Sequence, residues 1–313
     1  MNKLVIGTRR SRLARIQTTM VHDALSAKFP DLEIEEVVIV TKGDKILDSP
    51  LSMIGDKGLF TREIEVALIE GGIDLAVHSY KDLPTELPAG LTVGAVTVRE
   101  QPEDALVGVP GATLESLAPG SRIGSSSLRR VAQIRHARPD LEVLDIRGNV
   151  NTRIDRLDAG DYDALVLAAA GLKRMGLENR ISSMLGPENW FHAVSQGALA
   201  IETREGDDRV AGFVSMLEDP RTRTATDAER AFLRALEGGC QVPVGVRSAV
   251  ENGTVTLSGM VASPDGGLYF SGTEQGADAT AVGVKLAESL IDRGADKVLK
   301  MIRCDSETDG GEK

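Results

Sequence analysis

Residues 61–78, TREIEVALIEGGIDLAVH, decide the fold class of this chain. Ile64 and Leu68 fall on one face of a helix, and Gly71–Gly72 ends that helix. The run Asp74–His78 follows at once and predicts a short strand. A helix that leads directly into such a strand is the repeating element of α/β sheets, so we expect this class of fold.

The same alternation extends along the first two thirds of the chain. Strands are expected at Lys3–Gly7, Glu33–Val40, Asp74–His78 and Leu91–Val98, and again at Ala105–Val109, Arg122–Gly124, Leu141–Ile146 and Ala164–Ala169. Helices are expected at Ser11–Lys28, Thr61–Glu70, Ser127–Arg138 and Val150–Asp158. The polar stretch Arg99–Asp104 separates two successive α/β units, which we expect to have parallel strands and to form a weak repeat.

After about residue 200 the pattern changes to helices and to strands joined by tight turns. Helices are expected at Asp207–Leu217, Thr222–Leu236 and Ala277–Arg293, and strands at Val242–Val250, Gly253–Ala262 and Gly267–Thr273. This part predicts a small α+β domain with an antiparallel sheet. The polar tail Asp305–Lys313 is expected to be frayed.

The composition is that of a globular protein without a nucleic-acid surface. The 313 residues suffice for two or three domains, and 42% hydrophobic with 27% charged residues argue against disorder. The net charge of −11 excludes a general basic surface for nucleic acid. No apolar run is long enough for a signal peptide or a membrane span, so we expect a cytoplasmic protein.

The motifs do not support nucleotide or metal binding. The sequence has neither GxGxxG after a predicted strand nor GxxxxGK[ST]. Its histidines are scattered, and its two cysteines, Cys240 and Cys304, fit neither zinc spacing nor a disulfide framework. We therefore expect no metal site.

Three predicted strand-to-helix junctions carry arginine beside Ser, Thr or Asn: residues 8–11, 125–130 and 147–153. The carboxyl ends of strands and the N-termini of helices form anion sites in open α/β sheets. The alternative is that Ser, Thr and Asn merely cap the helices. Arginine at all three junctions favours a site for carboxylates or phosphates. Arginine is also abundant, with 11 lysines leaving 25 arginines among 36 basic residues, but composition alone favours a GC-rich genome as the reason for that bias.

Two loops carry side chains with possible chemistry. The first, HSYKDLP, places Lys81 and Asp82 after a predicted strand, where Asp82 could transfer a proton or stabilise a cation. A surface ion pair is the alternative there. The second, EGGCQVP, holds Cys240 behind two glycines that permit a tight loop exposing the thiol. A buried small hydrophobic residue is the alternative for this cysteine.

Seven stretches, in order along nearly the whole chain, resemble the porphobilinogen deaminase family, also called hydroxymethylbilane synthases. They are VTKGD (40–44), GDKGLFTREIEVALIEGGIDLAVHSYKDLP (55–84), GSSSLRR (124–130), LDIRGNVNTR (144–153), AGLKRMGL (170–177), SQGALAIE (195–202) and LEGGCQVPVG (236–245). The combination of LEGGCQVP with HSYKDLP and RGNV is highly specific for this family.

The resemblance implies a reaction and a cofactor. Four porphobilinogen molecules are deaminated and joined head to tail, and hydrolysis releases hydroxymethylbilane. The primer is a dipyrromethane cofactor attached through a thioether to Cys240. The resemblance further implies a monomer that binds neither nucleic acid nor membrane and passes its product to a tetrapyrrole-cyclising enzyme.

The family fold implied here has two α/β domains like those of periplasmic binding proteins and a small C-terminal α+β domain. Domain 1 would comprise residues 1–98 and 198–216, domain 2 residues 99–197, and domain 3 residues 217–313. The third domain would carry the cofactor cysteine.

The resemblance also assigns site residues. Asp82 would be catalytic and would also contact the cofactor. The primer carboxylates would be held by Lys81, Ser127, Arg129, Arg130 and Arg153. Contacts to substrate or to the growing chain would come from Arg9, Ser11, Ser126, Arg147, Arg174, Gln196, Lys57 and Phe60. Asp44 lies in a matching motif of the same active-site loop as Lys57 and Phe60.

The chain departs from the family pattern at three positions: Met53 replaces a usual lysine, Ser195 a frequent glycine, and Arg12 is an added arginine. Two other classes of protein would share parts of the pattern. A solute-binding or effector module would have two α/β lobes but no use for the cysteine loop. A thiol hydrolase would need a histidine near Cys240, and no motif nominates one.

Overall fold

The computed structural model describes residues 3–45, 60–186, 188–236 and 242–308. Lys57, Cys240 and the departure at Met53 lie outside these ranges. The chain divides into two compact units. The first comprises Met1–Pro102, Ala170–Leu177 and Gln196–Arg223, and the second Glu103–Ala169, Glu178–Ser195 and Thr224–Lys313. The three-domain boundaries expected from the resemblance remain a prediction.

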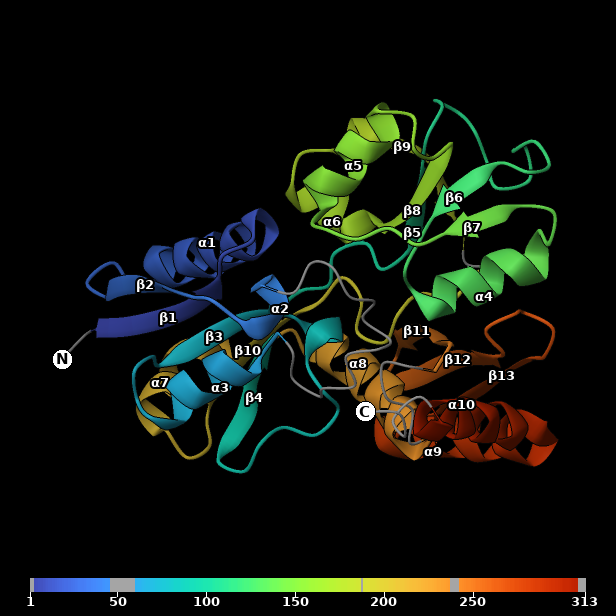
Figure 1. Ribbon diagram of the computed structural model, residues 1–313. Coiled ribbons are helices and arrows are strands. Elements are labelled where there is room, and N and C mark those ends of the chain that lie inside the picture. Colours follow the sequence, from blue (N-terminus) through green and yellow to red (C-terminus); the bar gives the residue numbers. More distant parts are fainter. Residues whose placement is uncertain (1–2, 46–59, 187, 237–241, 309–313) are drawn as a thin grey trace. The chain divides into compact units, whose positions relative to one another are not determined.

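The first unit contains a five-stranded sheet with helices (Figure 1). Its strand order is β2 (Glu33–Ile39), β1 (Lys3–Arg9), β3 (Leu75–Ser79), β10 (Leu199–Arg204) and β4 (Leu91–Val96). The helices α1 (Arg12–Lys28), α3 (Arg62–Ile69) and α7 (Asp208–Val214) belong to this unit, as does the short α2 (Lys42–Lys45). Leu4 and Leu25 pack together without solvent exposure, which joins α1 to β1. Ile64 and Leu68, predicted to share a helix face, are fully buried in a separate cluster.

The second unit contains a sheet with the same plan. Its order is β7 (Glu142–Leu144), β6 (Arg122–Gly124), β8 (Ala164–Ala168), β5 (Asp104–Val107) and β9 (Ile181–Leu185). Its helices include α4 (Leu128–Ala137) and α5 (Val150–Asp158). Ile123, Ile134 and Val166 are completely buried and join α4 to β6 and β8. The predicted repeat of two α/β units is confirmed at the level of strand order.

The expectation of purely parallel sheets is wrong, because both sheets are mixed. β10 runs antiparallel to β3 and β4, and β5 runs antiparallel to β8 and β9. Parallel neighbours require a long crossover, usually through a helix. β5 follows β4 through the irregular segment 97–103, and β10 follows residues 186–198, which form no helix among the described residues. No helical crossover therefore requires β5 or β10 to run parallel to the strands beside it.

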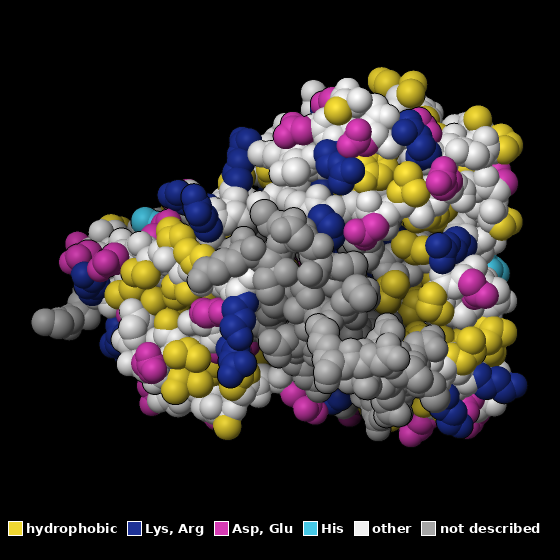
Figure 2. All heavy atoms as spheres, viewed as in Figure 1, with side chains coloured by type: hydrophobic (Ala, Val, Ile, Leu, Met, Phe, Trp, Pro, Cys, Tyr) yellow, Lys and Arg dark blue, Asp and Glu magenta, His cyan; other side chains and the backbone are white. Residues whose placement is uncertain are grey.

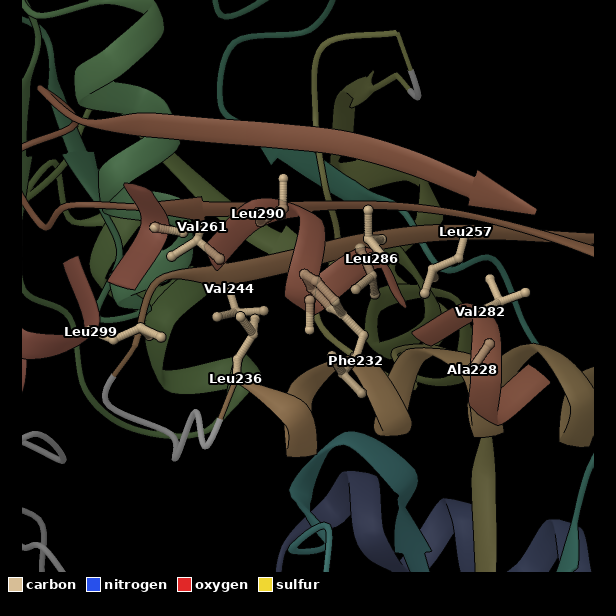
Figure 3. Close-up of a cluster of buried hydrophobic side chains, with 14 of the residues drawn as sticks. Ala228, Phe232, Leu236, Val244, Leu257, Val261, Val282, Leu286, Leu290 and Leu299 are labelled. Carbon is tan, nitrogen blue, oxygen red and sulfur yellow. The ribbon is translucent and has the colours of Figure 1, made fainter. Parts of the chain in front are cut away.

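The C-terminal part forms a three-stranded antiparallel sheet, as predicted. β11 (Val244–Glu251), β12 (Thr254–Ala262) and β13 (Tyr269–Gly276) are neighbours in that order. Asn252 and Gly253 both have positive φ, which a two-residue hairpin of this type requires. Side chains of α8 (Pro220–Ala235), α9 (Ala279–Leu290) and α10 (Asp296–Thr308) complete the core (Figure 3). Phe232, Leu257 and Leu286 are among its fully buried side chains.

Several elements were not anticipated from the sequence: α6 (Ala169–Arg174), β9, β10 and α10. α10 corrects the expectation of a frayed end from Asp305, because the helix continues to Thr308. Gly294, with φ of 108°, ends the preceding helical segment as predicted, but Val298 and Leu299 then bury in the third sheet's core. That burial stabilises a further helix. None of the helices in the described ranges is long and apolar enough to cross a membrane.

Candidate active site

The first junction, between β1 and α1, contains a helix cap and a guanidinium that stacks on a ring. The Oγ of Ser11 accepts a hydrogen bond from the Ala14 amide at 3.3 Å. The guanidinium of Arg9 lies 4.3 Å from the centre of the Phe60 ring, a cation–π distance. β1 and β3 are parallel neighbours, so Arg9 and the loop after β3 share one edge of the sheet. This is the edge at which open α/β sheets bind ligands.

The loop after β3 presents two charged side chains on one short turn. A 3-10 helix covers Tyr80–Asp82, and Tyr80 is buried whereas Lys81 and Asp82 are exposed. The Nζ of Lys81 donates to the Oε1 of Gln196 at 3.1 Å. The turn therefore places a carboxylate and an ammonium side by side at the sheet edge, accessible to a ligand.

The segment that precedes β10 contains Gln196 and binds the side chain of Arg174. Gln196 is buried, and its amide donates to the Pro102 carbonyl at 2.7 Å. Arg174 donates to the Gly197 carbonyl at 2.6 Å. Gly197 has φ of 92°, and a Cβ there would lie 2.2 Å from the Glu100 carbonyl, so the segment requires glycine. Burial lowers the pKa of Arg174, and its Nε has no hydrogen-bond partner within the described ranges, so an anion would stabilise it.

In the second unit the side chain of Ser126 connects the other two strand-to-helix junctions, residues 125–130 and 147–153. Its Oγ donates to the Ile146 carbonyl and accepts from the Ile146 amide at 3.2 Å. Ser127 and Asn149 occupy the N-cap positions of α4 and α5, but neither side chain makes a capping hydrogen bond. Side-chain capping therefore explains the first junction only. At the other two, the helix N-termini are suited to hold an anion.

Arg129 and Arg130 share one buried carboxylate, that of Asp104. Its two oxygens each lie 2.7 Å from one guanidinium, and the indole of Trp190 donates to it at 2.8 Å. Burial alone would raise the pKa of Asp104, but the two arginines hold it well below its usual value. Burial lowers the pKa of Arg129. Asp104 was not among the predicted site residues; its signal in the sequence is a carboxylate that opens the apolar strand DALV.

Arg153 lies buried near two other guanidinium groups, those of Arg130 and Arg147. Its Nε donates to the Gly148 carbonyl at 2.8 Å. Burial lowers its pKa to about 10, and repulsion from Arg130 and Arg147 adds to that effect, while Asp145 opposes it.

We call Arg129, Arg130, Arg147 and Arg153, with Asp104 and Asp145, the arginine cluster. An anionic ligand would reduce the repulsion that Arg130 and Arg147 exert on Arg153.

The structure brings several of the predicted residues into contact within each unit. In the first, Lys81, Gln196 and Arg174 are linked through residues 196–197, and Arg9 contacts Phe60. In the second, Ser126 and Ser127 lie at the junctions beside the arginine cluster. Within the described ranges, no three His, Cys, Asp or Glu side chains lie close enough to hold a metal ion.

Solved structures with a similar fold are distant in sequence. A putative methionine-binding lipoprotein from Bacillus subtilis is 12% identical, with a TM-score of 0.43, and covers 71% of this chain and 92% of its own. The methionine-binding protein MetQ is 13% identical, with a TM-score of 0.45 and the same coverage.

Related sequences identify the family of this chain. Residues 4–212 match the family model described as porphobilinogen deaminase, dipyromethane cofactor binding domain, and residues 224–292 match the porphobilinogen deaminase C-terminal domain. Porphobilinogen deaminase from Prochlorococcus marinus subsp. pastoris is 52% identical over 305 residues, covering 96% of both chains. The enzyme of that name from Roseiflexus castenholzii is 50% identical over 95% of this chain and 99% of its own. The chain therefore belongs to the porphobilinogen deaminase family, the dipyrromethane-dependent transferases of tetrapyrrole biosynthesis also called hydroxymethylbilane synthases.

Proposed function

We propose that this chain joins four porphobilinogen molecules head to tail on a dipyrromethane group that Cys240 holds through a thioether. The arginine cluster is the observation that carries the proposal. Each pyrrole ring bears one acetate and one propionate, so a dipyrromethane brings four carboxylates. The buried guanidinium groups of the cluster and the lowered pKa of Arg153 fit such a polyanion. When bound, the group supplies the ring carbon on which the product grows.

The arginines would have different tasks in this scheme. Arg129, Arg130 and Arg153, with Ser127 and Lys81, would bind primer carboxylates. Arg9 and Arg147 would bind the incoming or growing chain, supported by Ser11, Ser126, Arg174, Gln196, Lys57 and Phe60. The fork of a guanidinium suits a carboxylate better than an ammonium does. Asp104 would keep Arg129 and Arg130 oriented at the 2.7 Å distances observed.

Asp82 would act at the reacting centre. Loss of ammonia from porphobilinogen leaves an electron-poor methylene pyrrolenine. A carboxylate near the pyrrole N–H stabilises that positive charge, and it can also carry a proton to the leaving amine. The exposed position of Asp82 on its 3-10 turn supports this role, because substrate can reach the carboxylate.

We further propose that the protein acts as a cytoplasmic monomer and passes hydroxymethylbilane to a tetrapyrrole-cyclising enzyme. A hydroxymethyl-bearing linear tetrapyrrole is reactive, which makes an enzyme that closes the ring its natural consumer.

Asp82→Asn tests the catalytic role. We expect the rate of porphobilinogen consumption to fall at least about a hundredfold, because the amide keeps the shape but loses the charge. Glu86→Gln is the matched control, since Glu86 is an exposed carboxylate four residues further along the same loop. Intact mass should show the covalent two-pyrrole group in the unmodified protein.

The outcomes separate the alternatives. Near-normal turnover by Asp82→Asn would mean that Asp82 is an ordinary surface residue. Binding of porphobilinogen without a uroporphyrin-type chromophore would indicate a solute-binding module. A mass equal to the bare polypeptide, in protein from cells that make porphobilinogen, would contradict the thioether at Cys240.

A further inference from the structure

A pocket on α1 is not used by the proposed reaction. It has a volume of about 530 Å³, and its lining includes Arg10, Arg12, Arg15, Ile16, Met20 and Asp23. From Arg12 to Asp23 these positions recur at three- and four-residue intervals, so they form one stripe on the helix. We call this site the outer pocket. Figure 2 shows Lys and Arg side chains on the part of the face that α1 occupies in Figure 1.

The charges of the outer pocket are not satisfied by the protein. Arg10, Arg12 and Arg15 are exposed, and within the described ranges their side chains make no hydrogen bond or ion pair. Neighbouring guanidinium groups repel one another unless an anion lies between them. Three other arginines of this unit, Arg204, Arg209 and Arg223, each bind a carboxylate of the protein. The outer pocket therefore offers an uncompensated site for anions.

The remaining side chains restrict what kind of anion fits. Ile16 is half-buried and Met20 is 46% exposed, so the stripe includes an apolar surface. Asp23 adds one carboxylate to the same lining. A complementary ligand would have an apolar ring, at least two carboxylates and one ammonium. Porphobilinogen has this composition: a pyrrole with an acetate, a propionate and an aminomethyl group.

We propose that the outer pocket captures porphobilinogen before it reaches the reacting centre; this inference rests on the proposed function. The arginines bind the two carboxylates, Asp23 binds the ammonium and the ring lies on Ile16 and Met20. The protein as a whole carries a net charge of −11 and repels a ligand of net charge −1. A local cationic site overcomes that repulsion and raises the rate of substrate capture at low salt.

The test compares kcat and kcat/KM of the holoenzyme at about 20 mM and about 500 mM ionic strength. Arg10→Gln/Arg12→Gln/Arg15→Gln should lower kcat/KM for porphobilinogen about 3–10-fold at low salt, leave kcat unchanged and lose the effect at high salt. The control, Lys28→Gln/Arg221→Gln/Lys297→Gln, removes three exposed cations elsewhere and should change kcat/KM less than about 1.5-fold.

Asp23→Asn distinguishes a specific site from a general electrostatic field. Removing a negative charge would raise kcat/KM if only the field acted, because the substrate is an anion. Loss of a bond to the ammonium would lower it, by about 2–5-fold at low salt. Three results would overturn the proposal for the outer pocket. They are an equal kcat/KM in all variants, a fall in kcat/KM of the control as large as that of the triple arginine variant, and a rise in kcat/KM with Asp23→Asn. Failure of the unmodified protein to consume porphobilinogen would instead contradict the proposed function.

Discussion

Ser195 has a φ of 60°, a backbone conformation that residues other than glycine rarely adopt. Its side chain is fully buried, and its Oγ has no hydrogen-bond partner within the described ranges. The amide of Ser195 donates to Glu229 at 2.6 Å, which holds the residue in place. The departure from the frequent glycine of the family therefore introduces both strain and an unpaired hydroxyl.

Ser195→Gly should stabilise the protein by about 1 kcal/mol. Relief of the left-handed backbone and loss of the unpaired hydroxyl outweigh the greater entropy of glycine in the unfolded chain. The urea midpoint of unfolding measures the change. Asn252→Gly is the control, since Asn252 has φ of 49° in an exposed turn and asparagine tolerates that conformation. A lower midpoint for Ser195→Gly would show that its hydroxyl is bonded in solution.

Glu65 should make stability depend on pH. Its side chain is buried on α3, and burial first, then the carboxylate of Glu202, raises its pKa. A raised pKa in the folded state means that Glu65 favours folding while protonated and loses that contribution as pH rises through the folded pKa. Glu65→Gln mimics the protonated form, so it should raise the urea midpoint at pH 8 and change it little at pH 4.5. An equal shift at both pH values would contradict a titrating Glu65.

At the scale of elements, the β12–β13 turn packs against α4 within the second unit. Gly266 has φ of 76°, and a Cβ there would lie 2.7 Å from both the Ala132 carbonyl and the His136 amide. The ring of His136 stacks on Tyr269, with centroids 4.3 Å apart. Because both obstructing atoms belong to a helix backbone, neither can move aside.

Gly266→Ala should therefore destabilise the protein by roughly 2–4 kcal/mol, combining backbone strain with overpacking. Gly253→Ala is a matched control at the other hairpin turn. It has the same φ of 76°, but no atom lies within 4 Å of the position that its new methyl group would take. The control should cost only about 1–2 kcal/mol. Equal losses in the two variants, measured by urea unfolding, would mean that the turn does not press on α4.

At the scale of the whole molecule, the arginine cluster should make stability depend on its ligand. Cys240→Ser should lack the two-pyrrole group and unfold at a lower temperature, because a ligand bound only to the folded state adds stability. Salt should raise the melting temperature of Cys240→Ser more than that of the loaded protein, since ions screen the repulsion among the neighbouring guanidinium groups of the cluster. Cys304→Ser, which keeps the cofactor cysteine, is the control. An identical salt response in the three proteins would indicate that the cluster needs no anion.

The sequence by itself determined most of the helices and strands and the family of this chain. Periodicity located the buried face of α3, and turn residues located both hairpin turns of the third sheet, because local spacing and turn residues control these features. The motifs around Asp82 and Cys240 identified the reaction class. Local patterns are sufficient where neighbouring residues along the chain decide the conformation.

Only the tertiary structure decided the direction of β5 and β10 and the helix α10. Strand direction depends on how a chain enters a sheet, and α10 depends on burial of Val298 and Leu299 by distant residues. The pairing of Asp104 with Arg129 and Arg130, separated by 25 and 26 residues, was likewise invisible in the sequence. The charge balance of a buried site is a sum over side chains that folding brings together, so it belongs to the structure alone.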